Sequence, residues 1–283
     1  MDVLRCDNCD NEEETYGEGD LCICGGTFKP LKAKKADGSK VPCSAGLSGS
    51  APTKDVAIFL YDLNGVTAEP WLKAGYVCYI VDIQHRRGTH QDTKHPNLYR
   101  VGADIRGGWL PPRELVERCA FVAAFPPCDN LAVSGAAHFK GKGLRALALA
   151  VDLFATAAEL AEFIGAPYMI ENPISTISTY WRKPDYIFNP SEYGGYLPED
   201  DKHPRWPEYI APRDAYPKKT CLWGGNGFVM PPKIEVQPEL GYSRQHKKLG
   251  GRSLKTKNIR SETPRGFSAA MFLVNGKQLE GAA

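Results

Sequence analysis

The chain has 283 residues and a mass of 31.1 kDa, enough for one large domain and a small appendage. Hydrophobic residues make up 42% and charged residues 24%, and no apolar run approaches the about 18 residues of a membrane-spanning helix. The 35 basic and 33 acidic residues nearly cancel, which excludes a uniformly basic or acidic protein. The first residues lack the apolar stretch of a signal peptide, so a cytoplasmic protein without membrane contact is expected.

Four of the nine cysteines form a C-x2-C pair and a C-x-C pair near the start of the chain: Cys6, Cys9, Cys22 and Cys24. Two such pairs can supply four thiolates to one tetrahedral Zn²⁺. A segment of about 30 residues cannot build a core of its own, so a metal would supply most of its folding energy. We therefore predict a structural zinc-ribbon-like segment over residues 1–30 and a basic linker over 31–54. The alternative is four unrelated cysteines.

Beyond the linker, short apolar runs typical of buried strands alternate with helical segments. Strands are expected at 56–61, 76–82, 98–101, 119–124 and 168–170. Helices are expected at 66–75, 112–118, 142–164 and 264–274. Strands that alternate with helices predict an α/β domain built on a doubly wound, mostly parallel sheet of the Rossmann-like type.

Polar or small residues follow each predicted strand at its carboxyl end, where ligands bind in such sheets. The set comprises Asp62, Gly65, Asp82, Asp104, Pro126, Cys128, Glu171 and Asn172. Each residue alone has a plain explanation as a turn or a helix cap. Their order along the chain is the one that a nucleoside cofactor and a reactive centre would need.

This set resembles the DNA cytosine-carbon-5 methyltransferase family, and in particular its small, divergent phage-encoded members. Pro127-Cys128 is placed like the nucleophile motif of the family, and Glu171-Asn172-Pro173 is similar to its Glu-Asn-Val motif. Tyr61-Asp62-Leu63-Asn64-Gly65 looks like a divergent opening cofactor loop, and Arg260-Ser261-Glu262-Thr263-Pro264-Arg265 is similar to the late Arg-x-x-Thr-x-Arg motif. The resemblance covers about residues 56–275.

Three departures separate the chain from the family pattern. The opening loop lacks two of the usual glycines, and Asp129 follows Pro-Cys where Gln is common. The Gln-x-Arg-x-Arg strand is not present as such. Its expected remnant is the segment 217–223, in which Lys218 or Lys219 replaces an arginine.

The resemblance implies a catalytic domain over 55–224, a small target-recognition region over 225–260 and a C-terminal helix within 261–283 that packs back on the catalytic domain. It implies methyl transfer from S-adenosylmethionine to carbon 5 of cytosine in DNA. Cys128 would add to carbon 6 of the base, and Glu171 would protonate ring nitrogen 3. Asn172 would orient the base or its loop.

The resemblance also assigns the remaining strand-end residues to the cofactor. The opening loop, with Asp62, Leu63 and Gly65, would line the methionine end. The second and third strand ends would hold the ribose and adenine, with contacts from Asp82, Ile83, Asp104 and Ile105. Pro126 would complete the cofactor site beside the reactive centre.

Double-stranded DNA is the expected partner, and the protein is expected to act as a monomer. A base inside a duplex is out of reach, so it must be flipped into the pocket. Residues 218–265 hold eleven Lys or Arg against three Glu, and the loop 129–143 is basic and rich in glycine. The alternative for both is a solvated surface. Candidate DNA contacts are Ser134, Lys140, Lys142, Arg145, Lys218, Lys219, Arg244, Lys247, Lys248 and Arg252.

Two alternative functions stay open. In the first, the same scaffold would transfer a modified group to carbon 5, or act on RNA. The second is a non-catalytic nucleic-acid-binding protein made of a zinc ribbon and an inactive methyltransferase fold. The presence of both Cys128 and Glu171 argues against that last possibility, because a degenerate copy would lose them first.

Overall fold

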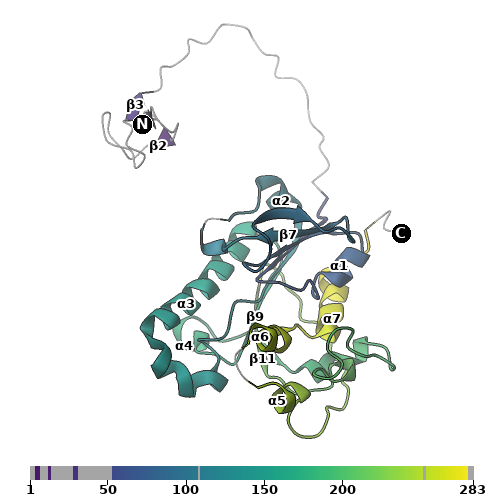
Figure 1. Ribbon diagram of the computed structural model, residues 1–283. Helices are drawn as coiled ribbons and strands as arrows, with labels where there is room; N and C mark the ends of the chain where they lie inside the picture. The colour runs from purple at the N-terminus through teal and green to yellow at the C-terminus, as the bar shows by residue number, and fades with distance from the viewer. Residues whose placement is uncertain are drawn as a thin grey trace. The chain divides into compact units, whose positions relative to one another are not determined.

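The computed structural model describes residues 53–107, 109–250 and 253–279, together with the backbone of three short strands nearer the start (Figure 1). The chain divides into two compact units, Met1–Gly49 and Ser50–Ala283. In the first unit, the central strand pairs antiparallel with a strand on each side. These strands are β1 (Leu4–Cys6), β2 (Glu12–Glu13) and β3 (Phe28–Pro30).

The predicted zinc ligands fall almost entirely outside the described residues. Cys6 ends β1, whereas Cys9, Cys22 and Cys24 lie in the part that the structure does not describe. Among the residues whose side chains are described, no three His, Cys, Asp or Glu side chains gather as metal ligands would. The zinc-ribbon-like segment therefore stays a prediction.

The second unit is built on an eight-stranded sheet with the strand order β10-β11-β9-β8-β4-β5-β7-β6. The five central strands, from β9 to β7, are parallel, while β6, β11 and β10 are added in antiparallel pairings. This mixed, mostly parallel α/β sheet confirms the predicted fold class at that level. The strands are β4 (Val56–Leu60), β5 (Val77–Val81), β6 (Gly88–Gln91), β7 (Leu98–Gly102), β8 (Cys119–Ala124), β9 (Tyr168–Pro173), β10 (Tyr186–Phe188) and β11 (Thr220–Gly225).

Helices cover both faces of this sheet (Figure 1). The α-helices are α1 (Glu69–Lys73), α2 (Arg113–Arg118), α3 (Phe139–Ile164), α4 (Ile177–Tyr180), α5 (Arg244–Lys248), α6 (Leu254–Ser261) and α7 (Arg265–Asn275). Short 3-10 helices are η1 (Ile105–Gly107), η2 (Val133–His138), η3 (Pro190–Tyr196) and η4 (Pro212–Asp214). None of the helices in the described part of the chain combines the length and the apolar character needed to cross a membrane.

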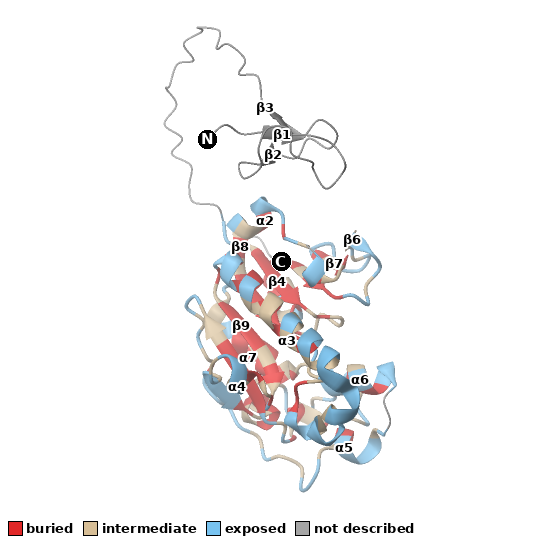
Figure 2. Ribbon diagram, turned by 90° about the vertical axis from the view of Figure 1, so that its left-hand side faces the viewer, coloured by how far each residue is buried: buried red, intermediate tan, exposed pale blue. Residues whose placement is uncertain are grey.

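Two hydrophobic cores lie on opposite faces of the sheet, and the strands between them are buried along most of their length (Figure 2). On one face, α3 packs its apolar side, including Phe154, against the sheet. On the other face, α1 and α7 pack together, and Trp71 of α1 stacks on Phe121 of β8 with ring centroids 4.8 Å apart. Apolar residues on successive strand positions thus face alternate cores, which explains why β4 reads as a continuous apolar run.

Several elements differ from the sequence-based expectation, and β10, α4, α5 and α6 were not among the strands and helices expected. The strand β6 was not expected, because its exposed Gly-Thr-His-Gln sequence has no apolar alternation, and it forms by pairing with β7. The helix α3 begins at Phe139 rather than at 142, and it is interrupted at Gly143, whose φ of 77° lies in the left-handed region. A glycine tolerates this break where other residues would be strained.

In the sheet of the second unit, the strand order reverses at β4. From β4 the chain moves outward to β5 and β7, and then returns to the other side of β4 through β8 and β9. Such a reversal of strand order leaves a crevice at the carboxyl ends of the strands. The predicted site residues follow these same strand ends.

Candidate active site

The loop after β4 is a tight turn organised by one carboxylate. Asp62 Oδ1 accepts hydrogen bonds from the backbone N–H groups of Asn64 (3.0 Å) and Gly65 (2.7 Å). Tyr61 adopts a φ of 58° and Gly65 a φ of 72°, so the backbone twists sharply on both sides of this carboxylate. The turn forms without the further glycines of the usual family loop because the Asp62 side chain replaces backbone bonds.

Asp62 is buried, and its second oxygen is free for a ligand. Oδ2 has no hydrogen-bond partner among the described residues, although it is shielded from solvent. Burial raises the pKa of the Asp62 carboxyl to about 6, and the two backbone N–H groups limit that rise. A buried carboxylate with an unused oxygen is suited to an ammonium group or to another strong donor.

At the end of β5, a polar and an apolar side chain stand next to each other. Asp82 is buried and accepts a hydrogen bond from the Gln84 backbone N–H through Oδ1 (2.7 Å). The following residue, Ile83, is 69% exposed. A carboxylate for ribose hydroxyls beside an exposed apolar side chain for a planar base is the combination that a nucleoside needs.

The end of β7 is arranged differently from the expectation. Both carboxylate oxygens of Asp104 accept hydrogen bonds from Arg106, at 3.1 and 2.6 Å, and this pairing lowers the pKa of Asp104. Ile105 is buried in the sheet core and not open to a ligand. A contact of Asp104 with an adenine amino group would need Arg106 to turn away, and Ile83 is the better placed apolar surface.

The loop that carries Cys128 is fastened to the strand that carries Glu171. The carboxamide of Asn172 donates from Nδ2 to the carbonyl oxygen of Pro126 (3.0 Å). Farther along, the Val133 N–H donates to Ile174 O (2.9 Å), and the Thr176 N–H donates to Leu131 O (3.2 Å). Three bonds between the two segments fix the nucleophile loop relative to the end of β9.

Cys128 lies at the first turn of this loop, and its carbonyl oxygen accepts the N–H groups of Leu131 (3.0 Å) and Ala132 (2.9 Å). Its side chain is half-buried, and burial raises the pKa of the thiol to about 11. The nearby charge of Glu171 raises this pKa further, whereas the charge of Lys218 lowers it. The thiol is therefore protonated at rest and depends on its neighbours for activation.

Glu171 is a buried acid close to that thiol. Burial raises the pKa of its carboxyl group, and the charge of Lys218 acts in the opposite direction. In the described part of the chain, Glu171 Oε1 and Asn172 Oδ1 are both shielded from solvent and have no hydrogen-bond partner. Burial thus favours the protonated form of Glu171, which is the form that can donate a proton.

Lys218 completes a group of three around the reactive centre. It precedes β11, whose first residue Thr220 pairs with Pro173 at the end of β9. Its backbone N–H donates to Asn189 Oδ1 (3.1 Å), and its Nζ donates to the Arg260 carbonyl (3.2 Å). The segment before β11 therefore brings a lysine whose charge acts on both Glu171 and Cys128.

The candidate DNA contacts have mixed surroundings. Several of them are exposed on the surface: Ser134, Lys140, Lys142, Arg145, Lys219, Lys247 and Lys248. Arg244 is bound instead to Glu239 through two hydrogen bonds, at 3.0 and 2.5 Å. Arg252 lies outside the described residues. The structure thus leaves seven basic or polar candidates exposed and turns Arg244 toward the protein itself.

Asp129, directly after Cys128, contacts two lysines from different elements. Lys257 Nζ on α6 lies 2.6 Å from Asp129 Oδ2, and Lys142 Nζ on α3 donates to the Asp129 carbonyl oxygen. The sequence places Lys257 among the basic donors of the expected recognition region, but it does not predict the contact with Asp129, because no motif pairs positions 128 residues apart.

A second group that sequence reasoning missed surrounds Glu262. This buried carboxylate accepts hydrogen bonds from Asn64, Arg205 and Trp206, and it lies beside His203. The His-Pro-Arg-Trp segment, residues 203–206, falls in the Pro-rich insertion over residues 195–216, which carries no family motif. In the fold, Glu262 connects this segment to Asn64 in the loop after β4.

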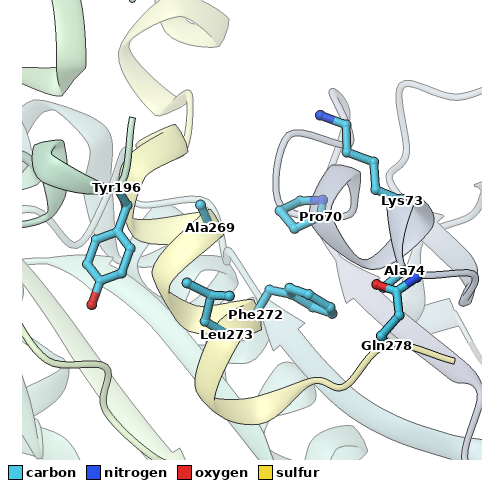
Figure 3. Close-up of a pocket in the computed structure, with 8 residues that line it drawn as sticks. All are labelled: Pro70, Lys73, Ala74, Tyr196, Ala269, Phe272, Leu273 and Gln278. Atoms are coloured by element: carbon cyan, nitrogen blue, oxygen red, sulfur yellow. The ribbon is translucent and has the colours of Figure 1, made fainter. Parts of the chain in front are cut away.

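A cavity of about 250 Å³ lies elsewhere, between α1 and α7 (Figure 3). Its lining is mainly apolar and comprises Pro70, Lys73, Ala74, Tyr196, Ala269, Phe272, Leu273 and Gln278. None of the predicted catalytic or cofactor residues lines it. We place the candidate site at the strand ends because the buried carboxyl groups and the thiol gather there.

Comparison of the sequence with models of protein families finds no match, and comparison with curated protein sequences finds no relative. The functional argument therefore rests on the residues and on their geometry.

Proposed function

We propose that this protein transfers a methyl group from S-adenosylmethionine to carbon 5 of cytosine in DNA. The observation that carries the proposal is the grouping of Cys128, Glu171 and Lys218 at the ends of β8, β9 and β11. A thiol, a buried carboxylic acid and a cation are the groups that this reaction asks of a protein.

The role of each residue follows from its surroundings. The thiol of Cys128 gives up its proton to solvent, and its sulfur forms a bond to carbon 6 of the base while Glu171 donates its proton to ring nitrogen 3. S-adenosylmethionine would supply an electrophilic methyl group for carbon 5 and leave as S-adenosylhomocysteine. The proton on carbon 5 then leaves to solvent, the bond between Cys128 and carbon 6 breaks, and nitrogen 3 returns its proton to Glu171, which restores the aromatic ring. Asn172 holds the nucleophile loop through Pro126.

The elevated pKa of Cys128 is compatible with this role. In the resting protein, the negative charge of Glu171 opposes formation of the thiolate. Once Glu171 is protonated, that opposition disappears while Lys218 still favours the thiolate. The site therefore couples a protonated acid to a more nucleophilic sulfur, which is the combination needed for attack on carbon 6.

The sheet and the strand ends support the cofactor assignment. The strand β11 runs antiparallel to both of its neighbours, β9 and β10, and so brings Lys218 to the end of the strand that carries Glu171. Asp62 offers an unused buried oxygen to the amino-acid end of the cofactor, within the part of the chain described. Asp82 and the exposed Ile83 offer a carboxylate and an apolar face to the nucleoside.

The test is nucleoside mass spectrometry on plasmid DNA from cells that express the wild type or Cys128→Ala. We expect 5-methylcytosine with the wild type and none with the variant. A different added mass on cytosine would favour a modified donor. Unchanged DNA together with methylated RNA would favour an RNA substrate. Unchanged nucleic acids with retained DNA binding would contradict catalysis and favour the non-catalytic protein.

A further inference from the structure

The late segment around Glu262 forms a buried polar cluster beside the opening cofactor loop. The Glu262 side chain is 1% exposed, and its two oxygens accept hydrogen bonds from two distant parts of the chain. Oε2 accepts from Asn64 Nδ2 (3.1 Å) and from Trp206 Nε1 (3.1 Å). Oε1 accepts from Arg205 Nη2 (2.5 Å). A buried carboxylate satisfied in this way holds its donors in place.

His203 belongs to the same cluster and contacts both the Arg205-Trp206 backbone and Glu262. Its Nδ1 accepts the backbone N–H groups of Arg205 (3.3 Å) and Trp206 (2.9 Å), so this nitrogen carries no proton. The other nitrogen, Nε2, then carries the hydrogen, and it lies 3.3 Å from Glu262 Oε1. Burial would raise the pKa of the Glu262 carboxyl, yet His203 and Arg205 together keep it lowered. Glu262 is therefore an anion that fixes the position of Arg205.

Arg205 has capacity for a second partner. Its side chain is 39% exposed, and its hydrogen bonds to described side chains consist of the single bond from Nη2 to Glu262. Burial dominates the pKa of Asp62, and the positive charge of Arg205 is among the smaller influences that lower it. Asn64 binds the same Glu262 and also donates its backbone N–H to Asp62. The Glu262 carboxylate therefore fixes both the turn that contains Asp62 and the side chain of Arg205.

An anion and a cation that are linked through Asn64 and Glu262 can match a zwitterion. The amino-acid end of S-adenosylmethionine carries an ammonium group and a carboxylate on the same carbon. Asp62 suits the ammonium group, and the guanidinium fork of Arg205 suits the carboxylate. We infer that Arg205, oriented by Glu262, binds the carboxylate of the amino-acid end of the cofactor. This inference rests on the proposed function and assigns a binding role to the Pro-rich insertion.

The test compares two ligands that differ at this end. S-adenosylhomocysteine carries the carboxylate, whereas 5′-methylthioadenosine keeps the nucleoside and lacks the amino-acid end. Calorimetric titration of the full chain would measure both affinities for the wild type, Arg205→Met, Arg205→Lys and the control Arg113→Met. Arg113 lies on α2, and its side chain is 91% exposed.

We expect Arg205→Met to weaken S-adenosylhomocysteine binding by about 10- to 100-fold and to leave 5′-methylthioadenosine binding unchanged. Arg205→Lys should recover part of the loss, and Arg113→Met should behave as the wild type. Glu262→Gln should produce the same selective loss to a smaller extent, provided that its thermal unfolding shows a folded protein.

Three results would overturn the inference. An equal loss for both ligands would show that Arg205 only supports the shape of the loop. Unchanged binding of both ligands in Arg205→Met would exclude a contact with the carboxylate while leaving the proposed function standing. If the wild type bound neither ligand, the proposed cofactor itself would be wrong.

Discussion

Asn172 donates a hydrogen bond from its side-chain amide to the backbone carbonyl of Pro126, 46 residues earlier in the chain, at 3.0 Å. Asn172 is completely buried, so neither partner has water as a replacement. The bond joins the loop that carries Cys128 to the strand that carries Glu171. A residue that the family resemblance assigns to the base or the loop is thus found to hold the loop.

Asn172→Ala removes this bond and leaves the Pro126 carbonyl buried without a donor. We expect a loss of about 1–3 kcal/mol in the free energy of unfolding. We also expect faster hydrogen exchange at the amides of Val133 and Thr176, which close the same loop. The control is Asn97→Ala, which changes an exposed asparagine. Equal stability and exchange in the two variants would contradict the structural role.

The charges around Cys128 predict opposite effects for two substitutions. Burial is the main cause of the high thiol pKa of about 11, but Glu171 raises it and Lys218 lowers it. Glu171→Gln should therefore lower the Cys128 pKa, and Lys218→Met should raise it. The pH dependence of iodoacetamide labelling, followed by mass spectrometry of the peptide that contains Cys128, measures both shifts.

Lys219→Met is the matched control for this experiment, because Lys219 is an exposed neighbour of Lys218. It should leave the labelling profile unchanged. Shifts in the same direction for Glu171→Gln and Lys218→Met would show that the three groups do not interact as described.

The raised pKa of Asp62 makes the free energy of unfolding decrease as the pH rises. Burial raises its pKa from 3.8 to about 6, so the folded state binds its proton more tightly than the unfolded state. The wild type should therefore lose stability as the pH rises from about 4 to about 6, by at most about 3 kcal/mol. Asp62→Asn removes this loss, so its stability relative to the wild type should increase over that range.

Urea unfolding at several pH values measures this difference, and Asp200→Asn controls for removal of an exposed carboxylate. The same Asp62→Asn protein should bind S-adenosylhomocysteine weakly, because the anion that faces the ammonium group is gone. A parallel pH dependence in the wild type and Asp62→Asn would exclude Asp62 as its source.

The predicted zinc site gives a direct measurement of metal content. We expect about one zinc per chain in the purified wild type and none in Cys22→Ser/Cys24→Ser, because two thiolates cannot hold the ion tightly. Cys43→Ser is the control, since Cys43 has no paired neighbour in the sequence. Zinc retained in the double variant would contradict the proposed ligand set.

Much of the fold follows from local sequence, and the reason is visible in particular strands. Runs such as 56–60 and 119–124 are apolar throughout because both of their faces are buried, and this signal does not depend on distant residues. The strand β6 escaped prediction because its residues are exposed and only its pairing with β7 makes it a strand. The break at Gly143 within α3 depends on a left-handed backbone that a helical pattern conceals.

For the candidate site too, the sequence predicts some features and not others. Asp62, Cys128 and Glu171 could be found because each follows a recognisable strand. The contacts of the residues next to them could not be predicted, because these contacts come from distant segments. Lys257 contacts Asp129 across 128 positions, and Glu262 contacts Asn64 across 198. Burial also decides details that sequence leaves open, as for Ile105, which packs in the core while Ile83 is exposed.

The contact between Lys257 and Asp129 leads to a prediction about DNA. Lys257 belongs to α6, near the nucleophile loop, and its Nζ lies 2.6 Å from the Asp129 carboxylate. A DNA phosphate that reaches this loop would compete with Asp129 for the lysine. Lys257→Met should therefore weaken DNA binding and reduce the slope of log affinity against log salt by about 1.

Asp129→Asn should have the opposite effect and tighten binding at low salt, since it releases Lys257 and removes a negative charge from the DNA side. Lys277→Met is the control, because Lys277 is exposed and its backbone N–H bonds to Tyr76, which precedes β5 at the opposite end of the sheet. Fluorescence anisotropy with a short duplex at several salt concentrations measures all four proteins. If Lys277→Met changed the slope as much as Lys257→Met, the basic surface would bind DNA without a defined contact beside Cys128.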